Sequence, residues 1–436
     1  MNTSLIHSRG PAPASRPGPH AQRGAAALIV TAVLCFAMLL VTLFLGRNLV
    51  FEQRSTANQY RSTLAFEAGE AGLEWALAQL NNAQPLDAAC TSSNAAGASS
   101  FRQRHLSFQR SNASHVPVTW NNAGVATALR PSCVRSGAGW ACSCPAQGAP
   151  ALTAPSGEND PAPAFSVQFQ AGDKPGVIRV IATGCSSLAG PCNPGSTAAA
   201  PDAVSRSMAT FGLAPGLTVT PVAALTARGP VDAAALGAHN PQPAGLAIHA
   251  GGALTATPSR LSGAAGAAAG ASIVAGDSPL AALTPSQFFA SYFGMDIATW
   301  QGQPAVQQVG CAASDCGAAL LQAAGNDMRQ QLLFVPGDLE LAGPLTLGTP
   351  ERPVLIVATG AARLSGAVRL HGVIYSASLA WNAHSGPGAL LRGAAITAGG
   401  YSGDAATDLH HDAAVLATLQ GNSGSFVRVG GSWRDF

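Results

Sequence analysis

A run of 21 residues without a charged side chain, from Ala25 to Leu45, sets the first condition on how this chain can fold. As an α-helix rising about 1.5 Å per residue, the run spans the roughly 30 Å hydrocarbon core of a bilayer. A secretory signal has a shorter apolar region, about 7–15 residues, which ends in small residues at a cleavage site. Gly46 and Arg47 follow here and offer no such site. We therefore expect a membrane anchor that is retained.

The segment before this run indicates the orientation of the anchor. Residues 1–24 contain three arginines, no acidic residue and several prolines. Basic flanks stay on the cytoplasmic side of a membrane, so we expect a cytoplasmic N-terminus. The whole chain has 23 basic and 21 acidic residues, a net charge of +2, and only 10% charged residues. Nucleic-acid binding requires a basic face, so no nucleic-acid partner is expected.

The helix is predicted to continue far beyond the apolar run. Residues 47–82 are rich in Ala, Leu, Glu, Gln and Arg, which favour helix. Apolar side chains recur at helical spacing, at Phe66, Leu73, Leu77 and Leu80. Proline is absent from residues 25–84, and Pro85 ends the pattern. We expect one helix of about 58 residues, with 25–46 in the membrane and 47–84 outside it.

Two features of this segment resemble a known family. Arg23-Gly24 followed by Ala-Ala-Ala-Leu-Ile-Val is similar to the prepilin-peptidase junction of type IV pilin-like proteins. The stretch Ala65–Leu73, AFEAGEAGL, is similar to the motif of the PilX group of pilus assembly proteins. The motif positions that match are Phe66, Glu70, Ala71, Gly72 and Leu73. The resemblance covers approximately residues 22–82.

This resemblance implies a minor pilin without enzymatic activity. Residues 1–24 would be a leader that prepilin peptidase removes after Gly24, leaving Ala25 as a methylated N-terminus. Residues Ala25, Leu28, Ile29 and Leu45 would belong to the membrane helix. The protein would cross the inner membrane of a Gram-negative bacterium once, with its remaining domains in the periplasm, and would later reach the pilus and the cell surface. Its partners would be minor and major pilins, and a PilY-type tip adhesin.

Two mature positions depart from the pattern of major pilins. The first mature residue is Ala25 instead of Phe, and the fifth is Ile29 instead of Glu. In major pilins that Glu neutralises the N-terminal amine of a neighbouring subunit. A buried ammonium without a partner is costly, so its loss disfavours repeated stacking and favours a position at the tip. The tip pseudopilin of type II secretion, GspK, shares this absence and is the first alternative. The second is a membrane-anchored adhesin or glycan-binding β-helix protein.

The cysteines predict disulfides. One of the nine, Cys35, lies in the apolar run. The other eight lie beyond the membrane: Cys90, Cys133, Cys142, Cys144, Cys185, Cys192, Cys311 and Cys316. An even number outside the cytoplasm favours disulfides, and short loops favour the pairs 185–192 and 311–316. The closely spaced residues 142 and 144 would each pair with 133 or 90, in an order that stays open. Zinc is disfavoured, because the ligand spacing is wrong.

The fold class expected beyond the helix is α+β. Four stretches in residues 85–220 alternate apolar and polar residues, at 116–120, 164–170, 176–184 and 204–212. We expect a small antiparallel pilin-like sheet there. Residues 221–436 contain short apolar strands separated by glycine, which favours a parallel β-helix over the alternative of a β-sandwich. A helical stripe within residues 285–300 interrupts this pattern, and we expect it to cap the stack or to cover one face.

No catalytic motif occurs in the chain. It lacks G-x-S-x-G, H-E-x-x-H, a phosphate-binding loop and a dinucleotide fingerprint. One polar cluster combines carboxylates and imidazoles, which together can bind a divalent ion. Its members are Asp404, Asp408, His410 and Asp412. We expect a solvated loop with a helix N-cap and no cofactor, with calcium as the alternative.

Overall fold

The computed structural model describes residues 22–155, 162–194, 201–256, 260–311, 315–325, 328, 330–382, 388–403 and 407–436. The predicted leader, residues 1–24, therefore lies almost entirely outside the described residues. Two compact units divide the chain between Tyr60 and Arg61, and each is described by itself.

The first unit is one apolar helical segment. Helix α1, Gln22–Leu80, runs through it and supplies all of its described residues. It begins three residues before the expected start and ends before Pro85, as the sequence predicts. The apolar side chains between residues 28 and 51 are exposed.

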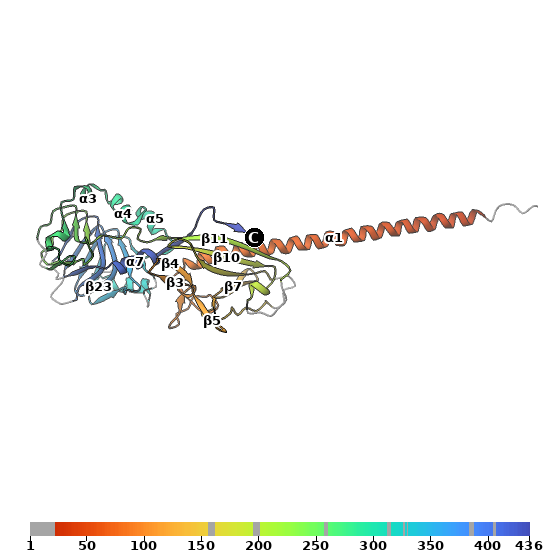
Figure 1. Ribbon diagram of the computed structural model, residues 1–436, viewed down its shortest axis with the longest axis horizontal. Helices are drawn as coiled ribbons and strands as arrows, with labels where there is room; N and C mark the ends of the chain where they lie inside the picture. Colours follow the sequence, from red (N-terminus) through yellow and green to blue (C-terminus); the bar gives the residue numbers. More distant parts are fainter. Residues whose placement is uncertain are drawn as a thin grey trace, which may run out of the picture. The chain divides into compact units, whose positions relative to one another are not determined.

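The second unit opens with the end of α1 and an antiparallel sheet. The sheet has the order β28-β11-β10-β9-β7-β8, and β29 also pairs with β11. Its strands are β7 (Ser132–Ser136), β8 (Gly139–Ser143), β9 (Ala164–Ala171), β10 (Val177–Cys185), β11 (Val204–Pro215), β28 (Gly424–Arg428) and β29 (Arg434–Asp435). The long alternating stretches of the sequence thus form the centre of this sheet, with β10 and β11 visible in Figure 1.

Small elements surround this sheet. They are β1 (Pro85–Leu86), β2 (Ser99–Ser100), α2 (Phe101–His105), β3 (Leu106–Gln109), β4 (Ser114–Pro117), β5 (Thr119–Asn122), β6 (Val125–Ala128) and the 3-10 turn η1 (Gly190–Cys192). The expected strand 116–120 is in fact divided at Val118 between β4 and β5. The two parts pair with different partners, β3 and β6. The division follows Pro117, which has no N–H to give to a ladder.

Parallel strands build the region between residues 223 and 411, which we call the head. The larger sheet contains β12 (Ala223–Ala227), β13 (Gly237–His239), β14 (Leu246–Ala250), β15 (Arg260–Ser262), β16 (Ile273–Val274), β17 (Val306–Gln308), β18 (Leu332–Val335), β20 (Leu345–Leu347), β21 (Val354–Ala358), β23 (Val368–Ser376), β25 (Leu390–Thr397) and β27 (Asp408–His411). The smaller sheet contains β19 (Leu339–Ala342), β22 (Ala361–Ser365), β24 (Ser378–Asn382) and β26 (Tyr401–Ser402).

The chain winds through the head in two runs. Among the described residues, every strand pair of the head is parallel. From β18 onward the chain passes repeatedly between the larger and the smaller sheet, and only β20 and β21 follow each other in the same sheet. The first run ends at β16, the second starts at β17, and they meet where β25 pairs with β12 and β27 pairs with β13. We call these two pairings the seam.

Glycines allow the strands of the second run to bend in step. Gly372 of β23 lies beside Gly393 of β25, and their φ angles are +143° and +136°. A Cβ atom built on Gly393 would lie 1.9 Å from the carbonyl oxygen of Gly372. Only glycine fits this close approach of successive strands.

Helices cover the outer face of the larger sheet. They are α3 (Ser278–Ala282), α4 (Pro285–Phe293), α5 (Ile297–Gln301) and α7 (Ala413–Asn422), all labelled in Figure 1. Helix α6 (Gly317–Ala324) instead buries Leu320 and Ala324 in the inner core, and the 3-10 turn η2 (Ala269–Ser272) lies beside β14. The predicted aromatic stripe is in α4, where Phe288, Phe289 and Phe293 pack with Tyr375 of β23. Side chains of the central strands β18 and β21 contact apolar partners on both sides, so these strands are buried on both faces.

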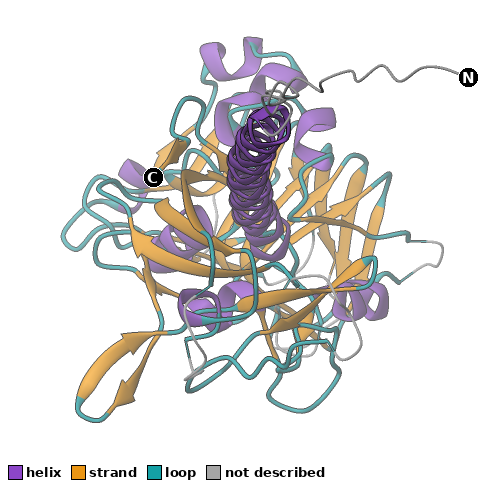
Figure 2. Ribbon diagram, turned by 90° about the vertical axis from the view of Figure 1, so that its right-hand side faces the viewer, coloured by secondary structure: helices purple, strands orange, loops and turns teal. Residues whose placement is uncertain are grey.

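The end of the chain leaves the head and returns to the antiparallel sheet. Strand β28 pairs with β11 from Phe211↔Arg428 to Pro215↔Gly424. This differs from the expected division, in which residues 221–436 form one C-terminal domain. Strand β28 thereby covers an edge that β11 would otherwise leave open. Figure 2 draws the strands in orange and marks the end of the chain with C.

Candidate assembly site and a polar cluster in the head

The candidate assembly site starts with the apolar half of α1. Leu28, Ile29 and Leu45 are 70%, 61% and 58% exposed. Within the described residues, one helix is long and apolar enough to cross a membrane, with a mean hydropathy of 2.9 in its most apolar window. Gly24 and Ala25 lie in the first turns of α1. So large an exposed apolar surface needs lipid or another apolar surface to cover it.

The family motif lies where α1 packs on the antiparallel sheet. Ala65, Ala68 and Leu73 are buried at helical spacing against this sheet. A Cβ atom on Gly184 of β10 would lie 2.0 Å from the carbonyl oxygen of Ala65. A Cβ atom on Gly72 would lie 3.0 Å from the Phe165 ring. Small residues on both sides therefore set the distance between helix and sheet.

The outward-facing residues of the motif contact the end of the chain. The indole Nε1–H of Trp433 donates a hydrogen bond of 2.8 Å to Glu70 Oε1. The Phe66 and Trp433 rings meet edge to face, with centroids 6.4 Å apart. Phe66 is 37% exposed, so it lies beside the buried stripe that the sequence predicts it to join. The motif thus holds the C-terminal segment as well as the sheet.

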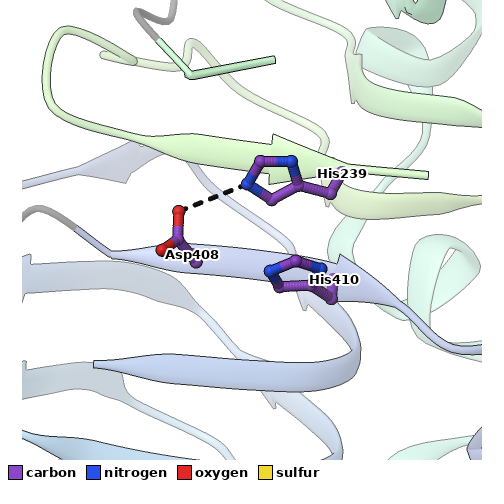
Figure 3. Close-up of side chains that lie close together, drawn as sticks. All are labelled: His239, Asp408 and His410. Carbon is purple, nitrogen blue, oxygen red and sulfur yellow. Dashed lines mark hydrogen bonds and ion pairs between the residues drawn. The ribbon is translucent and has the colours of Figure 1, made fainter. Parts of the chain in front are cut away.

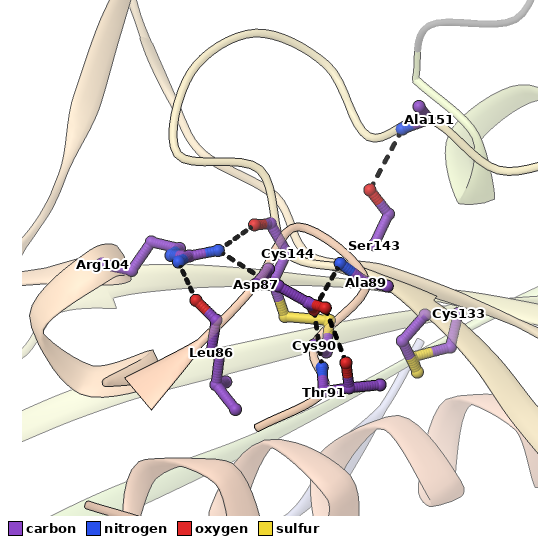
Figure 4. Close-up of a disulfide and its surroundings, with 11 residues drawn as sticks. Leu86, Asp87, Ala89, Cys90, Thr91, Arg104, Cys133, Ser143, Cys144 and Ala151 are labelled. Atoms are coloured by element: carbon purple, nitrogen blue, oxygen red, sulfur yellow. Dashed lines mark hydrogen bonds between the residues drawn. A yellow bond between two sulfur atoms is a disulfide. The ribbon is translucent and has the colours of Figure 1, made fainter. Parts of the chain in front are cut away.

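Four disulfides cross-link the second unit. They join Cys90 to Cys144, Cys133 to Cys142, Cys185 to Cys192 and Cys311 to Cys316. The last two are the pairs that the short loops favour. Cys133 and Cys142 are direct partners in the β7–β8 hairpin, which leaves Cys144 for Cys90 (Figure 4). Cys35 lies exposed in the apolar half of α1.

An arginine holds the loop beside the Cys90–Cys144 disulfide. The Arg104 guanidinium donates to the carbonyl oxygens of Leu86, Asp87 and Cys144, the last two at 2.7 Å (Figure 4). Asp87 accepts hydrogen bonds from the Thr91 hydroxyl at 2.7 Å and from the Thr91 and Ala89 amides at 2.9 Å. The hydrogen bond from the Thr91 side chain is the main cause that lowers the pKa of Asp87.

Two buried histidines lie near this arginine in the chain, His105 at the end of α2 and His115 in β4. His105 is 1% exposed, and neither ring nitrogen has a hydrogen-bond partner within the described chain. Burial, reinforced by the charge of Arg104, lowers the pKa of His105 to about 3. Burial and the charge of Arg102 lower the pKa of His115 to about 4. Both imidazoles are therefore neutral in the folded protein at pH 7.

The polar cluster expected in the C-terminal domain divides in the structure. Asp404 lies outside the described residues. Asp412 is the N-cap of α7 and accepts from the amides of Ala414 and Val415. Asp408 and His410 instead stand on β27 beside His239 of β13, as Figure 3 shows. One ligand atom from each of these three side chains lies within 4.8 Å of the others.

His239 is the member of this group that sequence reasoning missed. It precedes Asp408 by 169 residues, and the two meet only because β13 and β27 pair across the seam. The distance from His239 Nε2 to Asp408 Oδ1 is 3.2 Å, and the His239 and His410 rings stack with centroids 4.3 Å apart. The only signal in the sequence is a histidine at or next to the end of each of these two short strands, which does not reveal the partner.

Comparison with known proteins identifies the N-terminal module. Residues 23–74 match the family model described as PilX N-terminal. This match covers about an eighth of the chain and includes the Arg23-Gly24 junction, the apolar run and the whole motif Ala65–Leu73. The resemblance to PilX-type pilus assembly proteins is therefore confirmed for this module.

Two further comparisons used the whole chain. No curated protein matches the chain. A solved structure, the competence-associated pilin ComZ from Thermus thermophilus, aligns at 11% identity over 86% of this chain and 98% of that chain. The TM-score of this alignment is 0.24, which is too low to support an argument about the head.

Proposed function

We propose that this protein is a minor pilin of a type IV pilus, without enzymatic activity. The observation that carries the proposal is the PilX N-terminal match over residues 23–74, which extends from Arg23 to the end of the motif on the antiparallel sheet. In this proposal the apolar half of α1 inserts in the inner membrane of a Gram-negative bacterium. The second unit, with its four disulfides, lies in the periplasm, where disulfides form.

Assembly uses the same helix in a second environment. Prepilin peptidase removes the leader after Gly24, and Ala25 becomes the new N-terminus. The apolar side chains of α1, exemplified by Leu28 at 70% exposure, then pack against the helices of other pilins in place of lipid. The apolar surface of α1 is therefore kept away from water both in the membrane and in the filament.

The position in the filament follows from Ile29. An apolar residue there gives no carboxylate to the N-terminal amine of a neighbouring subunit. Since an ammonium buried without a partner is costly, repeated stacking of this subunit is disfavoured. We therefore propose that it primes assembly or stands at the tip, where a PilY-type adhesin can bind it.

Blocking the leader cleavage tests this function. The chain contains two Arg-Gly pairs near its start, Arg9-Gly10 and Arg23-Gly24. We expect Gly24→Arg to leave the protein at precursor size in its host and to reduce piliation, while the matched control Gly10→Arg matures normally. Mass spectrometry of the mature protein should find Ala25 at the N-terminus. Normal maturation of Gly24→Arg would contradict the proposal.

The type II secretion pseudopilus is the second candidate, because its tip subunit also lacks the Glu that Ile29 replaces. Deletion of the gene separates the two. Loss of pili and twitching with normal release of secreted proteins supports the pilus, whereas loss of secretion with intact pili supports the pseudopilus.

We also propose that the head is a parallel β-helix. What supports this class is the repeated passage of the second run between two parallel sheets, together with the stacked glycines at positions 372 and 393. An experimental structure of the head tests it, and antiparallel pairing between consecutive turns would contradict it.

A further inference from the structure

We propose that His239, Asp408 and His410 form a binding site for a transition-metal ion of the zinc type at the seam of the head. The three side chains come from two strands that the chain reaches about 170 residues apart. The site is independent of the proposed role in a pilus.

The register of the two strands brings these side chains to one face. Gly237 pairs with Asp408, Ala238 with Leu409, and His239 with His410. Ala238 and Leu409 are fully buried in the core of the head. Since successive side chains of a strand alternate between faces, the two histidines and the aspartate must share the opposite face.

The donor set selects the class of ion. Two imidazole nitrogens and one carboxylate oxygen suit zinc and its neighbours in the first transition series, and a fourth position stays open for water. Calcium prefers six to eight oxygen ligands, so this site does not suit it. Ligand atoms around a tetrahedral zinc ion lie about 3.4 Å apart, so the present spacing, within 4.8 Å, needs to close by at most about 1.4 Å.

Neighbouring groups orient two of the three ligands. Ser262 Oγ lies 2.8 Å from His239 Nδ1, which leaves His239 Nε2 on the side of Asp408. Such a hydrogen bond to the second ring nitrogen is typical of metal-binding histidines. Arg260 Nη1 lies 2.9 Å from Asp408 Oδ1 and holds the carboxylate in place. A carboxylate has two oxygens, so one can remain on Arg260 while the other binds the ion.

The space between the ligands depends on a glycine. A Cβ atom built on Gly237 would lie 2.1 Å from Asp408 Oδ1 and 3.2 Å from His239 Nε2. Any larger residue would therefore push the carboxylate away from the imidazole. His239 and Asp408 are 18% and 33% exposed, so an ion from solvent can reach them.

Binding would tie the two winding runs together. The first run contributes His239, the second contributes Asp408 and His410, and the ion would bridge the seam between them. Because an ion that binds only the folded state stabilises it by mass action, zinc should raise the unfolding temperature of the protein.

Zinc titration of the purified full chain tests the site. We expect one equivalent of Zn²⁺ to bind and to raise the melting temperature, while Ca²⁺ at the same concentration does not. His239→Ala and His410→Ala should each weaken Zn²⁺ binding at least tenfold. The matched control is His371→Ala, which removes a histidine on β23, two strands away from β27 in the same sheet.

Further variants guard against misfolding and nonspecific binding. Gly237→Ala should also weaken binding, although it removes no ligand. Cobalt bound in place of zinc should give the visible absorption of a tetrahedral site, and this absorption should disappear in His239→Ala. The proposal is overturned if folded His239→Ala, judged by circular dichroism, binds Zn²⁺ as the unaltered protein does. It is equally overturned if the unaltered protein binds neither Zn²⁺ nor cobalt.

Discussion

At the scale of single residues, the junction between helix and sheet depends on the absence of side chains. Gly184 faces the backbone of α1, whereas Gly69 of the same junction has its nearest atom, Ser207 Oγ, 3.5 Å from a built Cβ. The first position forbids a methyl group and the second accepts one. The two glycines therefore differ in the space available for a side chain, although both lie in the same contact between helix and sheet.

This difference gives a prediction for stability. Gly184→Ala should lower the free energy of unfolding by about 1–3 kcal/mol, because a methyl group there forces the helix away from the sheet. Gly69→Ala should be neutral or stabilising by up to about 1 kcal/mol, because alanine favours helix over glycine. Denaturant unfolding of both variants measures the effect. Equal stability of the two variants would contradict the proposed close packing.

The buried histidines predict a loss of stability in acid. The pKa of His105 falls to about 3 and that of His115 to about 4, both below the value of about 6.5 expected in the unfolded chain. The unfolded state therefore binds more protons, and stability is complete above pH 6.5 and is lost as the pH falls toward these lowered values. Between pH 7 and pH 5, each histidine should lower the free energy of unfolding by about 2 kcal/mol.

Substitution of one histidine tests this dependence. His105→Phe removes one titrating group and keeps an aromatic ring, so its unfolding free energy should fall less between pH 7 and pH 5. His249→Gln is the control, since His249 lies in the head and pairs with Asp277 at 2.7 Å. If the unfolding free energy of His105→Phe falls between pH 7 and pH 5 as much as that of the unaltered protein, the His105 imidazole is not buried as described.

At the scale of elements, the two disulfides of the β7–β8 region should differ in their contribution. Cys90–Cys144 closes a separation of 54 residues and Cys133–Cys142 one of 9. From the chain-entropy model, their removal should cost about 4 and about 3 kcal/mol. Paired Cys→Ala variants, unfolded under oxidising conditions, measure both costs. A larger loss for the 133–142 pair would contradict the expected order.

Elements with a strong local pattern could be predicted from the sequence. The uncharged run and the alternating stretches gave α1, β9, β10 and β11 nearly to their ends, because each pattern is complete within its own segment. The return of β28 to β11 could not be foreseen, since a five-residue strand does not specify its partner. His239 was missed for the same reason: its meeting with Asp408 depends on a pairing between distant strands.

At the scale of the whole molecule, the second unit is held together by contacts between its two ends. Asn81, at the end of α1, exchanges hydrogen bonds with the backbone of Phe426, at 2.9 and 2.8 Å. Arg102 donates to the carbonyl oxygens of Leu80, Asn422 and Gly424. The beginning and the end of this unit are thus fixed to each other, with the head inserted between them.

The seam has a consequence for the order in which the protein can be completed. A ribosome makes β12 and β13 first, yet their partners β25 and β27 emerge only about 170 residues later. Until then the growing chain carries an open sheet edge in the head, and β11 likewise waits for β28. A polypeptide released before residue 390 would carry both open edges at once. Newly made molecules therefore need protection from one another almost until synthesis ends.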